Sequence, residues 1–64
     1  MGKVFSSREI IQRLEADGWY LSKVRGDHHQ YKHDTRPGKV TVQHPKKDLY
    51  GSTLDSIFKQ AGWK

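Results

Sequence analysis

The segment Lys39–Gln43 constrains the fold most, because apolar and polar residues alternate along it without a break. Alternation with period two is typical of a half-buried strand, so we predict that Val40 and Val42 face a core and that their neighbours face outward. The preceding Pro37 and Gly38 fit a type II turn, in which proline presets φ and glycine takes a positive φ. The segment therefore predicts the second arm of a β-hairpin.

The first arm of this hairpin is expected at about residues 28–33. One set of alternate positions is wholly polar and is predicted to face solvent: His28, Gln30 and Lys32. The other set is predicted to face inward: His29, Tyr31 and His33. An earlier strand is expected at Trp19–Val24, which is rich in aromatic and β-branched residues. Gly26-Asp27 is a candidate two-residue turn between the two strands.

Helix signals lie on both sides of these strands. Ser6 and Glu9 have the spacing of a capping box, and the apolar positions that follow predict a helix over about Ser7–Asp17, ending near Gly18. A second helix is expected to be capped within residues 52–55 and to end at Gly62. Its apolar stripe has the spacing i, i+3, i+4, i+7 and comprises Leu54, Ile57, Phe58 and Ala61.

The predicted fold class is α+β, in the order α-β-β-β-α, with a three-stranded antiparallel sheet. Residues 1–64 are expected to form a single domain. Because each helix has one apolar stripe, both should lie on one face of the sheet and leave the other face wet. Four aromatic residues are expected in the core: Trp19, Tyr20, Tyr31 and Phe58. Tyr50 and Trp63 are candidates for an interface.

The composition favours a polyanionic partner. Twelve Lys and Arg residues stand against seven Asp and Glu residues, which gives a formal net charge of +5 with neutral histidines. On so small a protein this charge is most simply explained by nucleic-acid binding. The absence of cysteine excludes disulfides and thiolate chemistry and fits a cytoplasmic protein. No apolar run approaches the length of a membrane span, so no membrane association is expected.

Three blocks of the sequence resemble the HicA family, also called YcfA-like proteins, which are the toxins of HicA–HicB toxin–antitoxin systems. The blocks are Gly26-Asp27-His28-His29-Gln30-Tyr31-Lys32-His33, then Val40-Thr41-Val42-Gln43-His44-Pro45-Lys46-Lys47-Asp48-Leu49, and then Thr53-Leu54 with Ile57-Phe58-Lys59-Gln60-Ala61-Gly62. The blocks occur in the order and spacing of the family. Glu15-Ala16-Asp17-Gly18-Trp19 extends the resemblance to the end of the first predicted helix.

The resemblance implies a fold similar to a double-stranded-RNA-binding domain. It also implies an mRNA interferase, an endoribonuclease that stops translation by cutting messenger RNA, with a HicB-type antitoxin as partner. The family motif is Gly, a small residue and then the catalytic His, which in this chain is His28. Asp27 stands where the family usually has Ser or Gly.

The residues allow the implied chemistry. RNA carries its own nucleophile, the 2′-hydroxyl, and an imidazole serves as base or acid near neutral pH. We therefore expect His28 to be catalytic, without a cofactor or a metal. Candidate RNA-binding residues are Lys32, Lys39, Lys46, Lys47 and Gln30, and Gln43 is a further candidate for hydrogen bonding to RNA. Asp27 and His29 are expected to support the site from beside the catalytic imidazole.

Other interpretations compete with this one. The main alternative is a non-catalytic RNA-binding module of the same fold, and another is a domain that binds only protein. His33 and His44 are expected to be structural, although a second catalytic histidine is an alternative. A zinc site built from the four histidines is disfavoured because His28 and His29 point to opposite faces of the predicted strand.

Overall fold

The computed structural model describes residues 3–64 and has the predicted element order. Helix α1 spans Ser7–Ala16, strands β1, β2 and β3 span Tyr20–Arg25, His28–Lys32 and Val40–Gln43, and helix α2 spans Gly51–Ala61. The strands form one antiparallel sheet in the order β1-β2-β3. The predicted fold class, α-β-β-β-α with the arrangement of a double-stranded-RNA-binding domain, is confirmed. No helix among residues 3–64 has the length and apolar character needed to cross a membrane.

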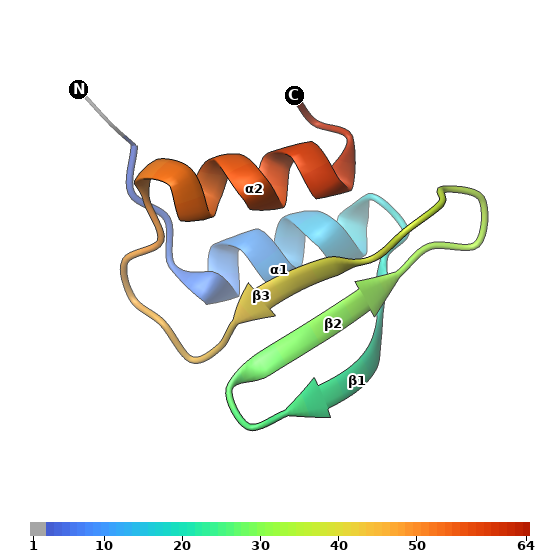
Figure 1. Ribbon diagram of the computed structural model, residues 1–64, viewed down its shortest axis with the longest axis horizontal. Helices are drawn as coiled ribbons and strands as arrows, with labels where there is room; N and C mark the ends of the chain where they lie inside the picture. The colour runs from blue at the N-terminus through green and yellow to red at the C-terminus, as the bar shows by residue number, and fades with distance from the viewer. Residues whose placement is uncertain (1–2) are drawn as a thin grey trace.

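Both helices lie on one side of the sheet, above β3 (Figure 1). Val40 and Val42 are fully buried beneath them, which confirms the predicted parity of that strand. The core is one cluster to which both helices and the sheet contribute: Ile10, Leu14, Trp19, Tyr31, Val40, Val42, Leu49, Leu54, Ile57 and Ala61. Since a 64-residue chain can bury little apolar surface, this single cluster is its main source of stability.

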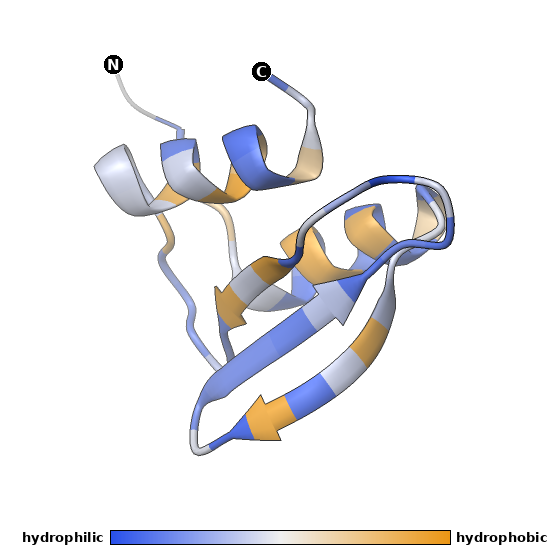
Figure 2. Ribbon diagram, turned by 45° about the vertical axis from the view of Figure 1, so that its right-hand side comes forward, coloured by the Kyte–Doolittle hydropathy of each residue, from blue (hydrophilic) through white to orange (hydrophobic). Residues whose placement is uncertain are grey.

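The helices do not cover β1, which extends past them at the edge of the sheet (Figure 1). Every residue of β1 is exposed, and the strand carries hydrophobic segments away from the core (Figure 2). The prediction that Tyr20 belongs to the core is therefore wrong, because its exposed fraction is 48%. Trp19, immediately before the strand, and Tyr31 are buried as predicted, and Phe58 is partly buried against the core.

A bulge explains why β1 lacks a clear alternation. Leu21 is paired with Tyr31, whereas the next pair joins Lys23 to Gln30, so that Ser22 has no partner on β2. An extra residue in one strand shifts all later side chains to the opposite parity. Leu21 and Val24, three positions apart, therefore share a face of the sheet.

The first helix begins as its capping box predicts. The Ser6 hydroxyl accepts a hydrogen bond from the Glu9 amide at 3.2 Å, and the Glu9 carboxylate accepts one from the Ser6 amide at 2.9 Å. The predicted cap of the second helix is wrong. Helix α2 begins at Gly51 after Tyr50, which contributes no side-chain capping hydrogen bond. The helix ends at Gly62 in the left-handed conformation, as predicted.

Trp63, one of the two interface candidates, makes its contacts within the protein. Its indole packs edge-on against Phe58, with the ring centroids 5.3 Å apart, and its Nε1 donates to Asp17 Oδ2 at 3.0 Å. The guanidinium of Arg13 lies 4.4 Å from the centroid of the Trp63 ring. Tyr50, the other interface candidate, is 59% exposed.

Candidate active site

His28 is the first residue of β2 and follows the two-residue turn between β1 and β2. The turn is possible because Gly26 adopts a φ of 57°, a left-handed conformation that glycine takes at little cost. The side chain of His28 is 61% exposed. Its neighbour His29 is paired with the buried Val42, so His28 faces the opposite, wet side of the sheet. An imidazole in this position is accessible to a large substrate.

Asp27 lies beside this imidazole and links it to β3. Its Oδ1 is 3.3 Å from Nδ1 of His28, and its Oδ2 accepts a hydrogen bond from Nε2 of Gln43 at 2.8 Å. The backbone carbonyl of Asp27 accepts a second hydrogen bond, from the amide of His44 at 2.7 Å. The hydrogen bond from Gln43, followed by the charge of His28 when it is protonated and the charge of Lys46, holds the pKa of the Asp27 carboxyl below its usual value.

The neighbouring strands place two further polar side chains next to His28. Arg25 is its partner on β1 and Gln43 is its partner on β3. Cross-strand partners share a face, so the imidazole lies between a guanidinium-bearing residue and an amide-bearing residue. Sequence reasoning overlooked Arg25, although a two-residue turn at Gly26-Asp27 necessarily pairs residues 25 and 28.

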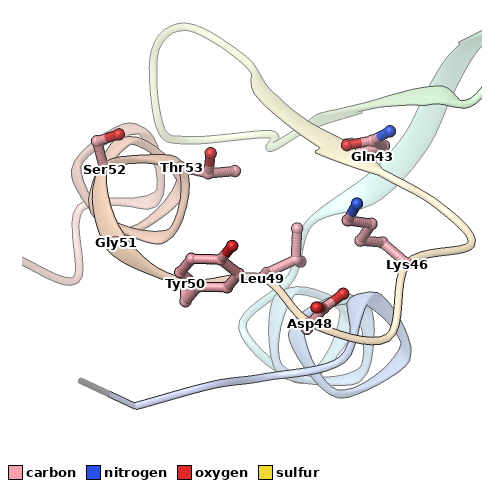
Figure 3. Close-up of a pocket in the computed structure, with 8 residues that line it drawn as sticks. All are labelled: Gln43, Lys46, Asp48, Leu49, Tyr50, Gly51, Ser52 and Thr53. Atoms are coloured by element: carbon pink, nitrogen blue, oxygen red, sulfur yellow. The ribbon is translucent and has the colours of Figure 1, made fainter. Parts of the chain in front are cut away.

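A hollow of about 440 Å³ begins at Gln43 and extends toward the start of α2. Gln43 and Lys46 lie on one side of it, and the first turn of α2 lies on the other (Figure 3). The backbone amides at this end of α2 have no side-chain cap, and no acidic residue occupies the first turn. The remaining lining residues include one carboxylate, that of Asp48. The hollow therefore has room and donors for a polar, negatively charged ligand.

The comparison with protein-family models agrees with this arrangement. Residues 7–63 match the model described as HicA toxin of bacterial toxin-antitoxin. The chain belongs to the HicA toxin family. The predicted resemblance is thereby confirmed over both helices and all three strands, and membership implies an antitoxin as partner. No curated protein matches the chain.

In this HicA toxin, a serine from α1 holds the loop that carries Lys46. Ser7 is 2% exposed. Its backbone amide donates to the Lys46 carbonyl at 2.7 Å, and its hydroxyl oxygen accepts from the Lys46 amide at 2.9 Å. The same hydroxyl lies 2.6 Å from Nδ1 of His44, so Ser7 also forms a hydrogen bond with this imidazole. This role of Ser7 was not predicted.

The other predicted RNA-binding residues of the toxin divide between two ends of the sheet. Lys46 and Lys47 follow β3 near His28. Lys32 and Lys39 are exposed at the opposite end, roughly 13 Å away along a strand at about 3.3 Å per residue. Gln30 is paired with Thr41 between the two ends, on the same face as His28. The structure thus brings together only part of the predicted set.

The remaining three histidines are partly buried and contact other parts of the protein, and the expected supporting role of His29 stays a prediction. His29 packs edge-on against His44, with ring centroids 5.0 Å apart. Nε2 of His33 lies 2.8 Å from the carbonyl oxygen of Asp17, and its Nδ1 accepts from the amide of Thr35 at 3.1 Å. Within residues 3–64, no three side chains of the types that ligate metals lie close enough together to hold an ion.

Proposed function

We propose that this HicA toxin is an mRNA interferase, an endoribonuclease that cuts messenger RNA with His28 as its catalytic group. The observation that carries the proposal is the exposure of the His28 imidazole on the wet face of the sheet, between Arg25 and Gln43. A histidine that served only packing would be expected on the buried face, as its neighbour His29 is. The net charge of +5 supports a polyanionic substrate.

The proposed chemistry uses the nucleophile within the RNA. As a base, His28 takes the proton of a 2′-hydroxyl, and the 2′-oxygen attacks the adjacent phosphorus. The bond to the 5′-oxygen of the next nucleotide breaks, and that oxygen takes up a proton. The products are a 2′,3′-cyclic phosphate and a 5′-hydroxyl. As an acid, His28 would instead supply the proton to the leaving oxygen.

Positive charge near the phosphate stabilises the negative charge that accumulates on its oxygens during the attack. Arg25 is one candidate, because it is the cross-strand partner of His28 and shares its face of the sheet. Lys46, at the edge of the hollow, and the neighbouring Lys47 are candidates for binding the RNA backbone on one side. Lys32 and Lys39 would contact a strand that continues across the sheet, with Gln30 between them and His28.

No step of this scheme requires a metal ion or an organic cofactor. The nucleophile belongs to the substrate, the proton transfers use an imidazole, and guanidinium and ammonium groups supply the positive charge. We therefore propose that the enzyme is metal-independent.

The decisive experiment incubates a synthetic RNA with the purified toxin in excess EDTA. Cleavage that leaves 2′,3′-cyclic phosphate ends is expected, and His28→Ala should reduce its rate by about 10²–10⁴-fold. Because the His28 side chain is largely exposed, the variant should fold normally, which circular dichroism can verify. Unchanged cleavage by a folded His28→Ala variant would refute the catalytic assignment.

A non-catalytic RNA-binding module is the second candidate function, favoured by the basic charge alone. It would shift the mobility of the RNA without cutting it. Expression in bacteria separates the two functions further: a nuclease should arrest growth through His28, whereas a binding module should act equally well with alanine at this position.

We also propose that the antitoxin is of the HicB type and neutralises the toxin by covering His28. An acidic partner would complement the basic protein, and the exposed imidazole is accessible to it. Adding the antitoxin should stop RNA cleavage and protect His28 from diethyl pyrocarbonate. Full inhibition with an unprotected His28 would indicate a different mode of neutralisation.

A further inference from the structure

The carboxylate of Asp27 has a polar neighbour at each oxygen. Oδ2 accepts from the Gln43 side chain at 2.8 Å, and Oδ1 lies 3.3 Å from Nδ1 of His28. The main chain is fixed as well, because the carbonyl of Asp27 accepts from the amide of His44 at 2.7 Å. A turn residue attached to β3 through both its backbone and its side chain has little freedom to rotate.

Resting on the proposed catalytic role of His28, we propose that Asp27 is a positioning residue that keeps a proton on Nδ1 of His28 and leaves the lone pair on Nε2. In a neutral imidazole one nitrogen carries the proton and the other accepts one. A carboxylate beside Nδ1 favours the tautomer with the proton on that nitrogen. Gln43 is the outer member of the chain, since its amide orients the carboxylate.

A purely structural role for Asp27 would not need this arrangement. The turn itself depends on the backbone of Gly26 at a φ of 57° and on the main-chain bond to His44. The carboxylate adds charge next to the imidazole, and the hydrogen bond from Gln43 lowers its pKa below the usual value. Lys46, in the loop after β3, is a positive charge close enough to act on this carboxylate. Arg25 is the cross-strand partner of His28 on β1. The tautomer of His28 shows whether the Asp27 carboxylate or the nearby positive charge determines which ring nitrogen carries the proton.

Asp27→Asn tests the proposal because it removes the negative charge beside Nδ1 of His28. If the Gln43 NH₂ group still donates to residue 27, the asparagine NH₂ group faces Nδ1 and can only donate, so Nδ1 becomes the acceptor. If both amides flip, a neutral oxygen faces Nδ1 in place of the carboxylate, and the preference for a proton on Nδ1 is weakened. The substitution is nearly isosteric and lies at an exposed position, so the fold should be retained.

Side-chain ¹⁵N NMR at neutral pH measures the tautomer without any RNA. The wild-type toxin is expected to show mainly the Nδ1–H form of His28, and Asp27→Asn a clear shift toward the Nε2–H form. Gln43→Leu should shift the ratio in the same direction but less far. Asp34→Asn changes an exposed carboxylate after β2, at the other end of the strand, and should leave the tautomer of His28 unchanged.

In cleavage assays, Asp27→Asn should lower kcat about 10- to 100-fold with little change in KM.

Each outcome of these measurements leads to a different conclusion. A tautomer that switches together with a fall in kcat supports the positioning role. A tautomer unaffected by Asp27→Asn, or one that switches while kcat is unchanged, overturns it. If the wild-type protein does not cleave RNA at all, the proposed function fails, and the NMR ratio still decides whether Asp27 controls the imidazole.

Discussion

The imidazole of His33 lies directly against the backbone of Gly18. A Cβ atom added at Gly18 would be 2.7 Å from Nε2 of His33, closer than real Cβ atoms approach a neighbour. The ring cannot easily move away, because Nε2–H donates to the Asp17 carbonyl and Nδ1 accepts from Thr35. Gly18 also has a φ of 95°, which L-residues with a side chain rarely adopt. This contact joins the end of α1 to the end of β2.

Gly18→Ala should therefore lower the free energy of unfolding by about 2–4 kcal/mol, from backbone strain and from the clash with His33. Urea denaturation measures the loss. Gly38→Ala is the matched control, because Gly38 has a φ of 80° but no atom within 4 Å of the added Cβ. It should lose only about 1 kcal/mol. Equal losses in the two variants would mean that the contact with His33 contributes nothing.

Ser7→Ala should lower the free energy of unfolding by about 1–3 kcal/mol, because it leaves the Lys46 amide and Nδ1 of His44 without their partner in a part-buried position. It should also accelerate hydrogen exchange at the Lys46 amide. Ser6→Ala is the control. It removes the cap of α1 and should cost about 1 kcal/mol without affecting exchange at Lys46. If the Lys46 amide still exchanges slowly in Ser7→Ala, the hydrogen bonds of Ser7 do not fix the loop that carries Lys46.

Asp17→Asn should make stability less sensitive to acid. The hydrogen bond from Trp63, together with the charge of Arg36, lowers the pKa of the Asp17 carboxyl in the folded protein. A depressed folded pKa adds stability above the unfolded pKa, and this stability is lost as the pH falls through the folded pKa. Denaturation midpoints measured from pH 7 down to pH 2 should thus converge for wild type and Asp17→Asn at the acid end. Asp34→Asn serves as the control, since its carboxylate lies outside this network. A constant gap between Asp17→Asn and wild type at all pH values would argue against linkage through Asp17.

Lys46→Ala should weaken RNA binding and reduce its dependence on salt. If Lys46 neutralises one phosphate, the slope of log K against log salt concentration should fall by about 0.7 for single-stranded RNA. Lys59→Ala removes the same charge from the last turn of α2, at the end remote from the hollow, and should leave the slope nearly unchanged. Binding measured with the His28→Ala variant as background avoids loss of the RNA by cleavage. Identical slopes for the two lysine variants would remove Lys46 from the RNA-binding surface.

Local patterns were sufficient to predict most of the fold. The capping box at Ser6, the alternation around Val40 and Val42 and the positive φ at Gly38 all involve residues close in sequence. The error at the start of α2 arose from a contact between segments far apart in the sequence. The cap of α2 was misplaced because Phe5 pairs with Leu49 through two backbone hydrogen bonds, and helix α2 then begins two residues later without a side-chain cap.

The candidate site was only partly predictable. The family motif pointed to His28 before its surroundings were known, and strand parity correctly separated it from His29. The partners of Asp27 and of Ser7 were not predictable, because Gln43 and His44 lie 16 and 37 positions away from them in the sequence. No helix or strand period relates residues at such separations. A polar side chain also has many possible hydrogen-bond partners, so the sequence does not identify the actual one.

The sequence by itself determined the order of the elements, the faces of β2 and β3, the family and the identity of the exposed histidine, because each depends on spacing within a short segment or on a motif. Only the tertiary structure decided that Asp27 bridges Gln43 and His28 and that β1 extends beyond the helices. The physical reason is that hydrogen bonds and coverage of a face depend on where distant segments pack, and packing is a property of the whole folded chain.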